Sequence, residues 1–399
     1  MAWTVGLDAL KKRSETPPDR TNALFVLTST LKAFLTRAAG WRAPPVGVGM
    51  MGAEHEGAQV RSSQKKRGAM IWEDFAVSDV WVDCDPGIDD AVMLAALSGA
   101  VGRGRVRLHG LSSVAGNMPL DVTTANLLAL ASYLALSHVP VARGADRPLV
   151  RAACDAAHVH GANGLGEVEI PAGDRALAND SAVLVMHKAI CSLAPARRMR
   201  LVATGPLTNI ALLLRAFPDD AARIQDVAIM GGSTCGGNVT PRAEYNIWAD
   251  PEAAHMVFAS GVPVVMCGLD VTLRSGLSAE QLAAMRDGDS ERLCALARML
   301  YFYKGDPAAW PHGVCVVHDA VPLLYVLAPD LFKGVRGVVE IGLGQDDRGE
   351  TRLFAAGDGA DADAAEASEN AAPPNALVLS LVDAPGFQKV LGNLLQAVR

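Results

Sequence analysis

The sequence lacks several features that would place it in a specialised class of protein. Its seven cysteines are widely spaced over 399 residues and form no Cys-x-x-Cys pair, so neither a disulfide framework nor a zinc site is indicated. No apolar run approaches the ~20 residues that a transmembrane helix needs. Acidic residues outnumber basic ones by 43 to 36, which argues against a nucleic-acid-binding surface. These absences predict a soluble, cytoplasmic protein that works at neither a membrane nor a nucleic acid.

Composition sets the first 74 residues apart from the rest. Over residues 1–70, Lys and Arg outnumber Asp and Glu by 11 to 5, and apolar spacing predicts one helix over 21–39. Such a basic segment is a disordered extension, a targeting leader or a misassigned start. We therefore predict an N-terminal extension over 1–74 and one large domain over 75–399. Within that domain, the acidic, Ala-rich stretch at 357–374 is predicted to be a flexible insertion.

From residue 78 onward, short β-branched runs alternate with helical periods, which is typical of a parallel sheet covered on both faces. Strands are predicted over 80–84, 106–114, 139–142, 199–203, 227–230 and 262–268, and helices over 88–98, 120–136, 181–193, 208–215 and 251–260. Later helices over 279–286, 290–303 and 319–327 precede a hairpin (335–343 and 351–355), a strand (376–382) and a closing helix (386–398). The sequence predicts an α/β fold: an open, mostly parallel, doubly wound (Rossmann-like) sheet with a small C-terminal β-rich and helical part.

Four carboxylates crowd the point where the first predicted strand meets the first predicted helix. They are Asp83, Asp85, Asp89 and Asp90, and Pro86-Gly87 turns the chain between them. Buried carboxylates that lie this close would have pKa values raised by as much as ~3–5 units unless a cation were present. Oxygen ligands without a neighbouring Cys or His cluster favour Ca²⁺ or Mg²⁺. We predict Ca²⁺, because solvated strand-end caps would account for one such Asp but not for four.

Other polar groups are ambiguous when taken singly. The Gly-rich stretch at 231–238 lacks the Gly-Lys-Ser/Thr of a phosphate-binding loop and is predicted to be a turn. Asn238, Glu244 and Asn246 have the donors and acceptors that vicinal sugar hydroxyls need, although Asn238 alone would be read as a turn residue. Asp319 alone would be a helix N-cap. Lone histidines such as His160 would be solvated loop residues.

Taken together, these motifs resemble the inosine-uridine-preferring nucleoside hydrolase family. The matching stretches follow the family's order between residues 78 and 345: DCDPGIDDA at 83–91, VAGN at 114–117, HVHG at 158–161, ATGPLTNIA at 203–211, MGG at 230–232, AEYN at 243–246, DPEAA at 250–254 and VHD at 317–319. The first motif is highly specific, whereas the others are weak singly and strong jointly.

The resemblance implies a role for each matched residue. The implied calcium ligands are Asp85, Asp90, Asp319 and the backbone carbonyl of Thr204, with Asp83 supporting them from outside. Asp89 matches the general base that takes a proton from a calcium-bound water, and His318 matches the residue that assists departure of the nucleobase. The implied substrate-binding residues are Asn117, His160, Met230, Asn238, Glu244, Tyr245 and Asn246.

The resemblance also implies the reaction, which is hydrolysis of ribonucleosides to free base and ribose in nucleoside salvage, carried out by a homodimer or homotetramer. The residues suit this chemistry. Cleavage of an N-glycosidic bond builds positive charge on the ribose, much as in glycoside hydrolysis, and carboxylates stabilise that charge. A metal and an adjacent carboxylate can together deprotonate water near neutral pH. No Ser or Cys stands in a convincing triad, so water is expected to attack directly.

The match is weakest over residues 301–317, the region that shapes the nucleobase pocket in the family. This segment carries Tyr301, Tyr303, Trp310 and His312 in a divergent context, so no preference for purines or pyrimidines is predicted. His312 would either donate a proton to the departing base or, more simply, be a surface residue.

Two alternative functions stay open. The first is a catalytically silent ribonucleoside-binding protein with the same fold. The second is a haloacid-dehalogenase-like phosphatase that uses Asp83 and Asp85 as its Asp-x-Asp pair. That motif normally continues with Thr or Val where Gly87 stands, and it leaves Asp89 and Asp90 unexplained.

Overall fold

The computed structural model describes residues 77–136, 138–305, 307, 310–355 and 373–398. The predicted extension over 1–74 and its helix over 21–39 lie outside the described residues. The same holds for the 357–374 insertion, apart from its last two residues. These predictions, and the domain boundary near residue 75, therefore stay predictions.

Nine strands of the described region form one sheet, whose order is β10-β9-β11-β6-β5-β4-β1-β2-β3. Their bounds are β1 Ser78–Cys84, β2 Val106–Ser113, β3 Val141–Arg143, β4 Met199–Ala203, β5 Ile224–Met230, β6 Val264–Cys267, β9 Phe332–Ile341, β10 Thr351–Ala355 and β11 Ala376–Val382. Neighbours from β3 across to β11 are parallel, whereas β9 pairs antiparallel with both β11 and β10. The α/β prediction is confirmed, and the C-terminal strands extend the same sheet.

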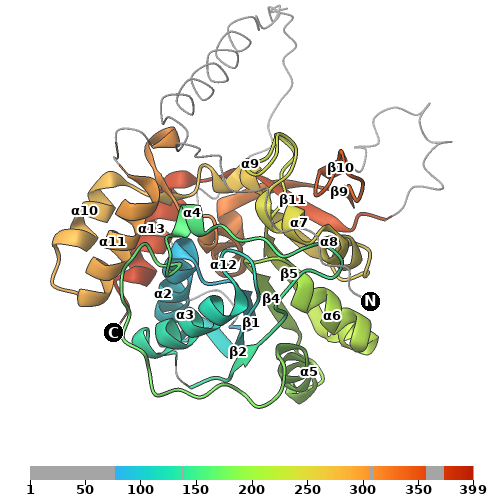
Figure 1. Cartoon of the computed structure of the whole chain (residues 1–399), viewed down its shortest axis with the longest axis horizontal. Coiled ribbons are helices and arrows are strands. Elements are labelled where there is room, and N and C mark those ends of the chain that lie inside the picture. Colours follow the sequence, from blue (N-terminus) through green and yellow to red (C-terminus); the bar gives the residue numbers. More distant parts are fainter. Residues whose placement is uncertain (1–76, 137, 306, 308–309, 356–372, 399) are drawn as a thin grey trace, which may run out of the picture. The chain divides into compact units, whose positions relative to one another are not determined.

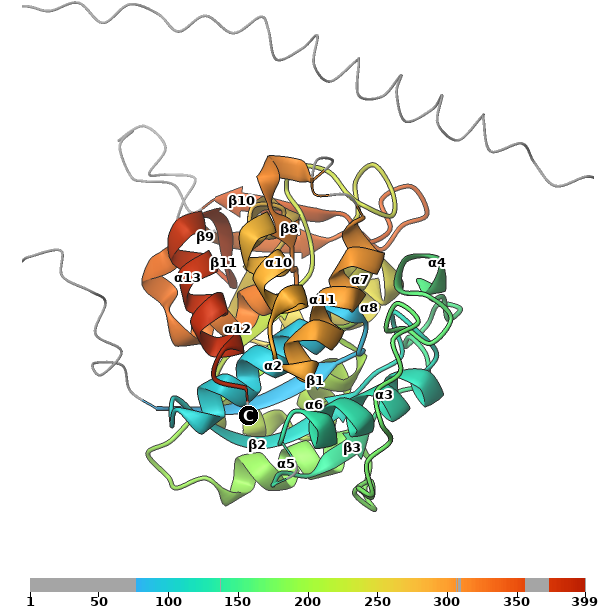
Figure 2. The same cartoon turned by 90° about the vertical axis from the view of Figure 1, so that its left-hand side faces the viewer.

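Helices cover both faces of this sheet (Figures 1 and 2). Their bounds are α2 Ile88–Gly102, α3 Leu120–Tyr133, α5 Ala182–Ser192, α6 Thr208–Ala216, α8 Pro251–Phe258, α10 Ala279–Asp287, α11 Glu291–Lys304, α12 Ala320–Leu327 and α13 Ala384–Leu395. Two apolar clusters follow from the alternation of side chains along β1. Val80 and Val82 pack with α2, α3, α11, α12 and α13, whereas Trp81 packs with α5, α6 and α8.

Several short elements were not predicted. They are α4 Ala157–His160, α7 Tyr245–Ala249, α9 Leu269–Thr272, a two-stranded sheet of β7 Gly276–Leu277 and β8 Cys315–Val316, and the 3₁₀ turns η2 Pro218–Arg223, η4 Pro311–Gly313 and η5 Pro329–Leu331. Elements of two to six residues are too short to show an apolar period, so the sequence pattern does not indicate them. Among the described residues, no helix has the length and apolarity to span a membrane.

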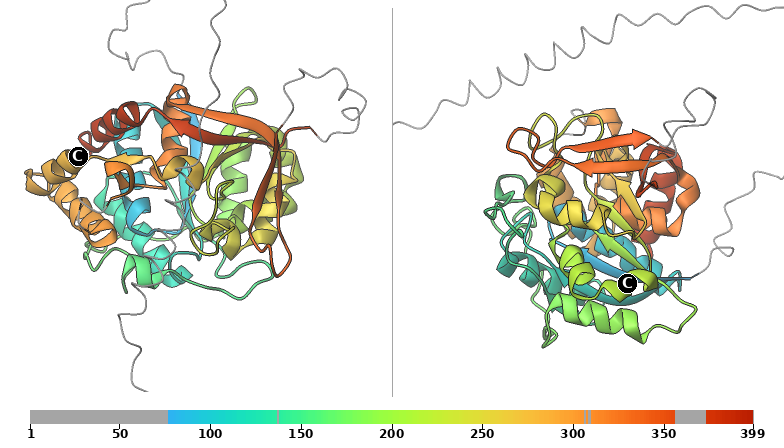
Figure 3. Two further views of the ribbon diagram at one scale, coloured as in Figure 1. Left: turned by 90° about the horizontal axis from the view of Figure 1, so that it is seen from above. Right: turned by 90° about the vertical axis from the view of Figure 1, so that its right-hand side faces the viewer.

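The order of connections places a crevice at the centre of the sheet. From β1 the chain proceeds to β2 and β3 on one side, then returns to β4 on the other side of β1 and continues to β5 and β6. In open parallel sheets, ligands bind beyond the carboxyl ends of the strands at such a reversal. The views in Figure 3 show the helices on the sheet and the long β9 and β11 arrows, which lie on the β10 side of the central strands.

Candidate active site

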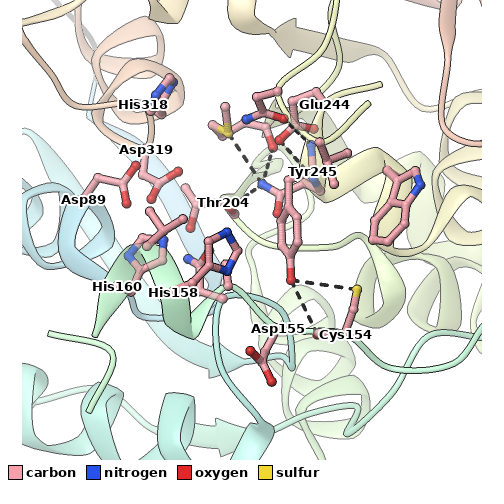
Figure 4. A pocket seen from close by; sticks show the side chains of 18 of the residues that line it. Asp89, Cys154, Asp155, His158, His160, Thr204, Glu244, Tyr245, His318 and Asp319 are labelled. Atoms are coloured by element: carbon pink, nitrogen blue, oxygen red, sulfur yellow. Dashed lines mark hydrogen bonds between the residues drawn. The ribbon is translucent and has the colours of Figure 1, made fainter. Parts of the chain in front are cut away.

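A pocket of about 270 Å³ opens beyond the carboxyl ends of the central strands (Figure 4). This is close to the lower end of the ~300–1,000 Å³ range of small-molecule sites. The predicted residues that line it are Asp89, Asn117, His160, Thr204, Met230, Asn238, Glu244, Tyr245, Asn246, His318 and Asp319. Asp85 and Asp90 are fully buried and do not line the pocket. The fold therefore brings motifs that are more than 200 residues apart into one cavity.

A buried carboxylate cluster lies at this pocket. Asp89 and Asp90 occupy the first turn of α2, and Asp319 immediately precedes α12. One carboxylate oxygen from each lies within 4.8 Å of the others. Asp90 is held on both sides, because its Oδ1 accepts from the Thr204 hydroxyl (2.7 Å) and its Oδ2 accepts from the backbone N–H of Gly87 (3.0 Å).

Asp85 lies next to this cluster, and only one of its two carboxylate oxygens has a hydrogen-bond partner. Its Oδ2 accepts from the backbone N–H of Asn117 (2.7 Å), whereas its Oδ1 is buried without a hydrogen-bond partner. The backbone packs tightly around this carboxylate: a Cβ on Gly116 would lie 2.0 Å from Asp85 Oδ2, and one on Gly205 would lie 2.9 Å from its Cγ. Both positions therefore require glycine. An unpaired buried carboxylate oxygen is costly unless another group supplies the missing partner.

Burial dominates the electrostatics of the cluster. It raises the pKa of Asp85 and of Asp319 well above the usual range, and that of Asp90 to about 7, with repulsion between the neighbouring carboxylates acting in the same direction. Lys304 Nζ lies over the Tyr303 ring at 3.6 Å and forms no ion pair with the cluster. A bound divalent cation would relieve this excess of negative charge.

The donor set fits a hard cation. Its side-chain donors are all carboxylate oxygens, and the carbonyl of Thr204 accepts one N–H from Asn246 Nδ2 (2.8 Å), which leaves that oxygen a second lone pair. Asn117 Nδ2 donates to the Asp85 carbonyl (3.2 Å) and to Asp90 Oδ2 (3.3 Å). The side-chain amides of both asparagines therefore also position residues that are predicted to be metal ligands, a second role that the sequence did not indicate.

Asp83 does not face the pocket. Its Oδ1 accepts from the Ser112 hydroxyl (2.5 Å) and from Asn209 Nδ2 (2.8 Å), and burial raises its pKa to about 7. A phosphatase of the Asp-x-Asp type needs this carboxylate as an exposed nucleophile. Because Asp83 is 1 % exposed and does not line the cavity, the phosphatase alternative is disfavoured.

Glu244 forms the pocket wall opposite the acid cluster (Figure 4) and also caps a helix. Its carboxylate accepts from the backbone N–H groups of Asn246 (2.9 Å) and Ile247 (3.1 Å) at the start of α7, and from Gly232 (2.9 Å). Burial raises its pKa to about 7, against the effect of these donors. Asn238 Oδ1 accepts from the Tyr245 N–H (2.9 Å). Glu244 therefore caps α7 and also lines the cavity.

Two histidines face the pocket in defined orientations. His160, at the end of α4, accepts from the Ile88 N–H at Nδ1 (3.2 Å) and stacks on Tyr303 with ring centroids 5.4 Å apart. His318 Nδ1 lies 2.8 Å from the Thr272 hydroxyl. Burial lowers the pKa of both rings, that of His318 to about 4 with a further contribution from Lys304. Both rings are therefore neutral near pH 7.

Several lining residues were missed by the sequence analysis. They are Cys154, Asp155, Ala156, Val159, Val239 and Trp248. Trp248 carries a signal in retrospect, because it follows Tyr245 by one turn of α7 and so lies on the same face. From the divergent 301–317 segment, Tyr303 lines the pocket, whereas His312 is exposed and does not. This placement favours the interpretation of His312 as a surface residue.

Comparisons with known proteins agree with this geometry. Residues 80–389 match the family model described as inosine-uridine preferring nucleoside hydrolase. The pyrimidine-specific ribonucleoside hydrolase RihA of Salmonella paratyphi B is 35% identical over 321 residues, which cover 79% of this chain and 97% of RihA. The non-specific ribonucleoside hydrolase RihC of Shigella dysenteriae is 40% identical over 254 residues, which cover 63% and 80%. The structure of a purine-preferring ribonucleoside hydrolase from Gardnerella vaginalis superimposes with a TM-score of 0.70 at 30% identity, covering 80% of this chain and 99% of that one.

Proposed function

Because the chain belongs to the inosine-uridine preferring nucleoside hydrolase family, whose curated members hydrolyse ribonucleosides, we propose that its pocket cleaves the N-glycosidic bond of ribonucleosides to give free base and ribose. The observation that carries this proposal is the unpaired oxygen of Asp85 beside three converging carboxylates, at a pocket rich in groups that bind hydroxyls. Such a site binds a cation and a polyol together.

We assign the cation as Ca²⁺, held by Asp85, Asp90, Asp319 and the carbonyl of Thr204. A set made only of oxygen donors, most of them carboxylates, suits this ion. When bound, the cation lowers the pKa of a coordinated water molecule.

Asp89 is assigned as the general base. It belongs to the carboxylate cluster and also lines the cavity, whereas Asp85 and Asp90 are sealed beneath it. A carboxylate in this position accepts the proton of the attacking water. Asp319 also lines the cavity, and we assign it to the cation.

The ribose is expected to lie between the cluster and Glu244. The side-chain Nδ2 atoms of Asn117 and Asn246 donate to other groups of the protein. Their side-chain Oδ1 atoms are therefore the ones left to accept from ribose hydroxyls. Glu244 and the acid cluster place negative charge on both sides of a sugar that becomes positive as the glycosidic bond lengthens. Met230 and Asn238 complete this part of the wall.

The nucleobase is expected to lie near the two histidines. In His318, the contact of Nδ1 with Thr272 leaves Nε2 as the ring atom available to the departing base. In His160, acceptance of the Ile88 N–H at Nδ1 leaves Nε2 as the proton-bearing atom. We assign His318 the tautomer whose Nδ1 accepts from the Thr272 hydroxyl, so that Nε2 carries the proton as it does in His160. In these tautomers both rings offer a hydrogen bond, which stabilises negative charge on the leaving group without a charged imidazolium.

The test is release of free base from inosine, guanosine, adenosine, uridine and cytidine, with and without a calcium chelator. We expect chelator-sensitive release, and the panel gives the base preference, on which the named relatives differ. Nucleoside binding without release in the presence of Ca²⁺ would overturn the proposal in favour of a silent binder. A homodimer or homotetramer, and a role in salvage, stay expectations of the family resemblance.

A further inference from the structure

A second group of metal-ligating side chains lies far from the pocket. His187 and Cys191 are one turn apart on α5, and Asp220 lies in η2, just before β5. None of the three lines the pocket. In two perpendicular views, α5 lies at the lower edge of the molecule, away from α4 and α7, which carry pocket residues (Figures 1 and 2). The group is therefore independent of the proposed active site.

The candidate ligand atoms are spaced close to what a tetrahedral metal requires, with the two Asp220 contacts made by different carboxylate oxygens. Cys191 Sγ lies 3.7 Å from His187 Nδ1 and 4.0 Å from Asp220 Oδ1, and His187 Nδ1 lies 2.9 Å from Asp220 Oδ2. Tetrahedral Zn²⁺, with a Zn–S bond of roughly 2.3 Å and Zn–N or Zn–O bonds of roughly 2.0–2.1 Å, separates its ligand atoms by about 3.3–3.6 Å. The observed distances depart from this range by about half an ångström, which small side-chain rotations would remove.

The site is also held in place by its surroundings. The His187 ring stacks on Phe217 with centroids 3.7 Å apart and planes 8° from parallel, which fixes the direction of its nitrogen atoms. Asp220 is 3 % exposed, so its carboxylate is anchored in the protein. Cys191 is exposed. Two fixed ligands and one accessible thiol leave the fourth coordination position open to solvent.

A His–Asp ion pair alone would not explain why the Cys191 thiol lies beside His187 and Asp220. The same chain provides that simpler arrangement at the start of β1, where His109 Nε2 lies 2.7 Å from Asp79 Oδ1 and the other partners of Asp79 are arginines. At α5, by contrast, the third partner is a cysteine at the i+4 position, which places it on the same helix face as the histidine. A His, Cys and Asp set is typical of borderline-soft metals.

We propose that His187, Cys191 and Asp220 bind a thiophilic divalent cation, with Zn²⁺ as the best match. On binding, the Cys191 thiol releases its proton to solvent and Sγ bonds to the metal. The Nδ1 proton of His187 that bonds Asp220 also leaves to solvent while Nε2 takes one up, so the neutral ring binds through the freed lone pair of Nδ1. The metal replaces the His187–Asp220 hydrogen bond. The bound metal ties α5 to η2. The His, Cys and Asp donors disfavour Ca²⁺, which prefers the all-oxygen cluster of the pocket.

The test uses Co²⁺ as a spectroscopic substitute for Zn²⁺ on the full chain, with Ca²⁺ in excess to occupy the oxygen-only cluster. We expect a thiolate-to-cobalt absorption band that saturates at one Co²⁺ per chain and is displaced by Zn²⁺. Cys191→Ser is expected to abolish the band, and Asp220→Asn is expected to weaken Co²⁺ binding by more than about tenfold. Cys294→Ser is the matched control, because Cys294 is a thiol of α11 outside the cluster.

The variants are also to be compared for cleavage of nucleosides, which does not involve this cluster. A wild-type chain without the band, or a band that persists in Cys191→Ser, would overturn the proposal. Because the substituted cysteine is exposed, Cys191→Ser is expected to fold, and unchanged circular dichroism checks this. The spectroscopic readout tests the metal site even if the pocket proves inactive.

Discussion

The two ends of the central sheet treat buried acids in opposite ways. At the amino end, Asp79 in β1 contacts Arg197 and lies 2.7 Å from His109 Nε2, and Asp226 in β5 lies 3.3 Å from Arg200. At the carboxyl end, the acid cluster begins with Asp85, only six residues further along the chain from Asp79. Among the described residues, no Lys, Arg or His forms an ion pair with Asp85, Asp89, Asp90 or Asp319.

This difference separates structural acids from functional ones. At the amino end, the chain itself supplies the counter-charge of Asp79 and Asp226. Removal of one partner from a buried ion pair costs on the order of 3–5 kcal/mol, because it leaves an unpaired buried charge. The carboxyl end leaves that charge to be supplied from outside. The absence of an internal partner therefore supports the proposal that this end of the sheet binds a cation, and the contrast between the two ends can be tested by experiment.

Removal of the divalent cation is expected to have the largest effect. Chelation should abolish nucleoside hydrolysis and lower the unfolding temperature, because the carboxylates of the cluster are then left to repel each other. Added Ca²⁺ should restore both. Elemental analysis checks that the chelated protein holds no metal. Unchanged hydrolysis by that protein would contradict the proposal that a bound cation supplies the counter-charge of the cluster.

Removal of a substrate hydroxyl is expected to come next. Cleavage of 2′-deoxyinosine should be slower than that of inosine by about 10⁴-fold in kcat/KM, because the hydroxyl-binding groups and the cation would be left unsatisfied. The comparison needs equal Ca²⁺ for both substrates. Similar rates for the two nucleosides would mean that the ribose does not lie between the cluster and Glu244.

Asp89→Asn is expected to lower kcat by about 10²–10⁴-fold, the usual contribution of a general base, while binding of Ca²⁺ and nucleoside is retained. Single-turnover rates and calorimetric titration measure the two properties separately. Asp121→Asn is a matched control, because Asp121 is an exposed acid whose ion pair with Arg143 lies on the surface. Near-normal turnover of Asp89→Asn would remove Asp89 from the mechanism.

At the amino end, Asp79→Asn is expected to act on stability and not on chemistry. Loss of this carboxylate leaves His109 and the partly buried Arg197 without their anion, which should lower the free energy of unfolding by about 1–3 kcal/mol. Chemical denaturation measures this change. The kcat of the folded fraction should stay at the wild-type value, and a large fall in kcat would show that the two ends are coupled.

Asp226→Asn is expected to have the smallest effect, a pH-dependent change in stability whose direction can be predicted. Burial raises the pKa of Asp226 above its ordinary value of 3.8, and Arg200 offsets this only in part. Because the folded state then binds the proton more tightly than the unfolded state, wild type should lose stability relative to the variant as pH rises above 3.8. Denaturation midpoints of both proteins from pH 3 to pH 8 measure the difference. A relative gain in wild-type stability over that range would mean that Arg200 neutralises Asp226 fully.

Much of this architecture can be predicted from local sequence, because parallel strands buried on both faces appear as continuous apolar runs. The bounds predicted for β4 and β11 agree with the structure, and β1, β2 and β6 differ by one or two residues at an end. The motif residues on the loops after β1 and β4 could also be predicted to lie close together, because the carboxyl ends of parallel strands meet at one edge of the sheet.

Contacts between distant segments could not be predicted. The pairing of Asp79 with Arg197, the position of Trp248 at the pocket and the approach of Asp220 to α5 all depend on how loops return to the sheet. Apolar periodicity carries no information about such returns. Short elements such as α4 and α7 show no apolar period either. His160 and Tyr245 were therefore assigned to substrate binding only through the family resemblance, and their place on these helices could not be predicted.

The proposed calcium ligands come from segments that the ribosome synthesises at very different times. Asp85 and Asp90 leave the ribosome early, Thr204 midway and Asp319 only after most of the chain has been synthesised. No partial chain can therefore assemble the site, although it already contains the densest group of acids. A cation that binds only the folded protein stabilises it by mass action. Because Asp319 is the last ligand to be synthesised, the cation is expected to stabilise the chain only after nearly all of it has been made and folded.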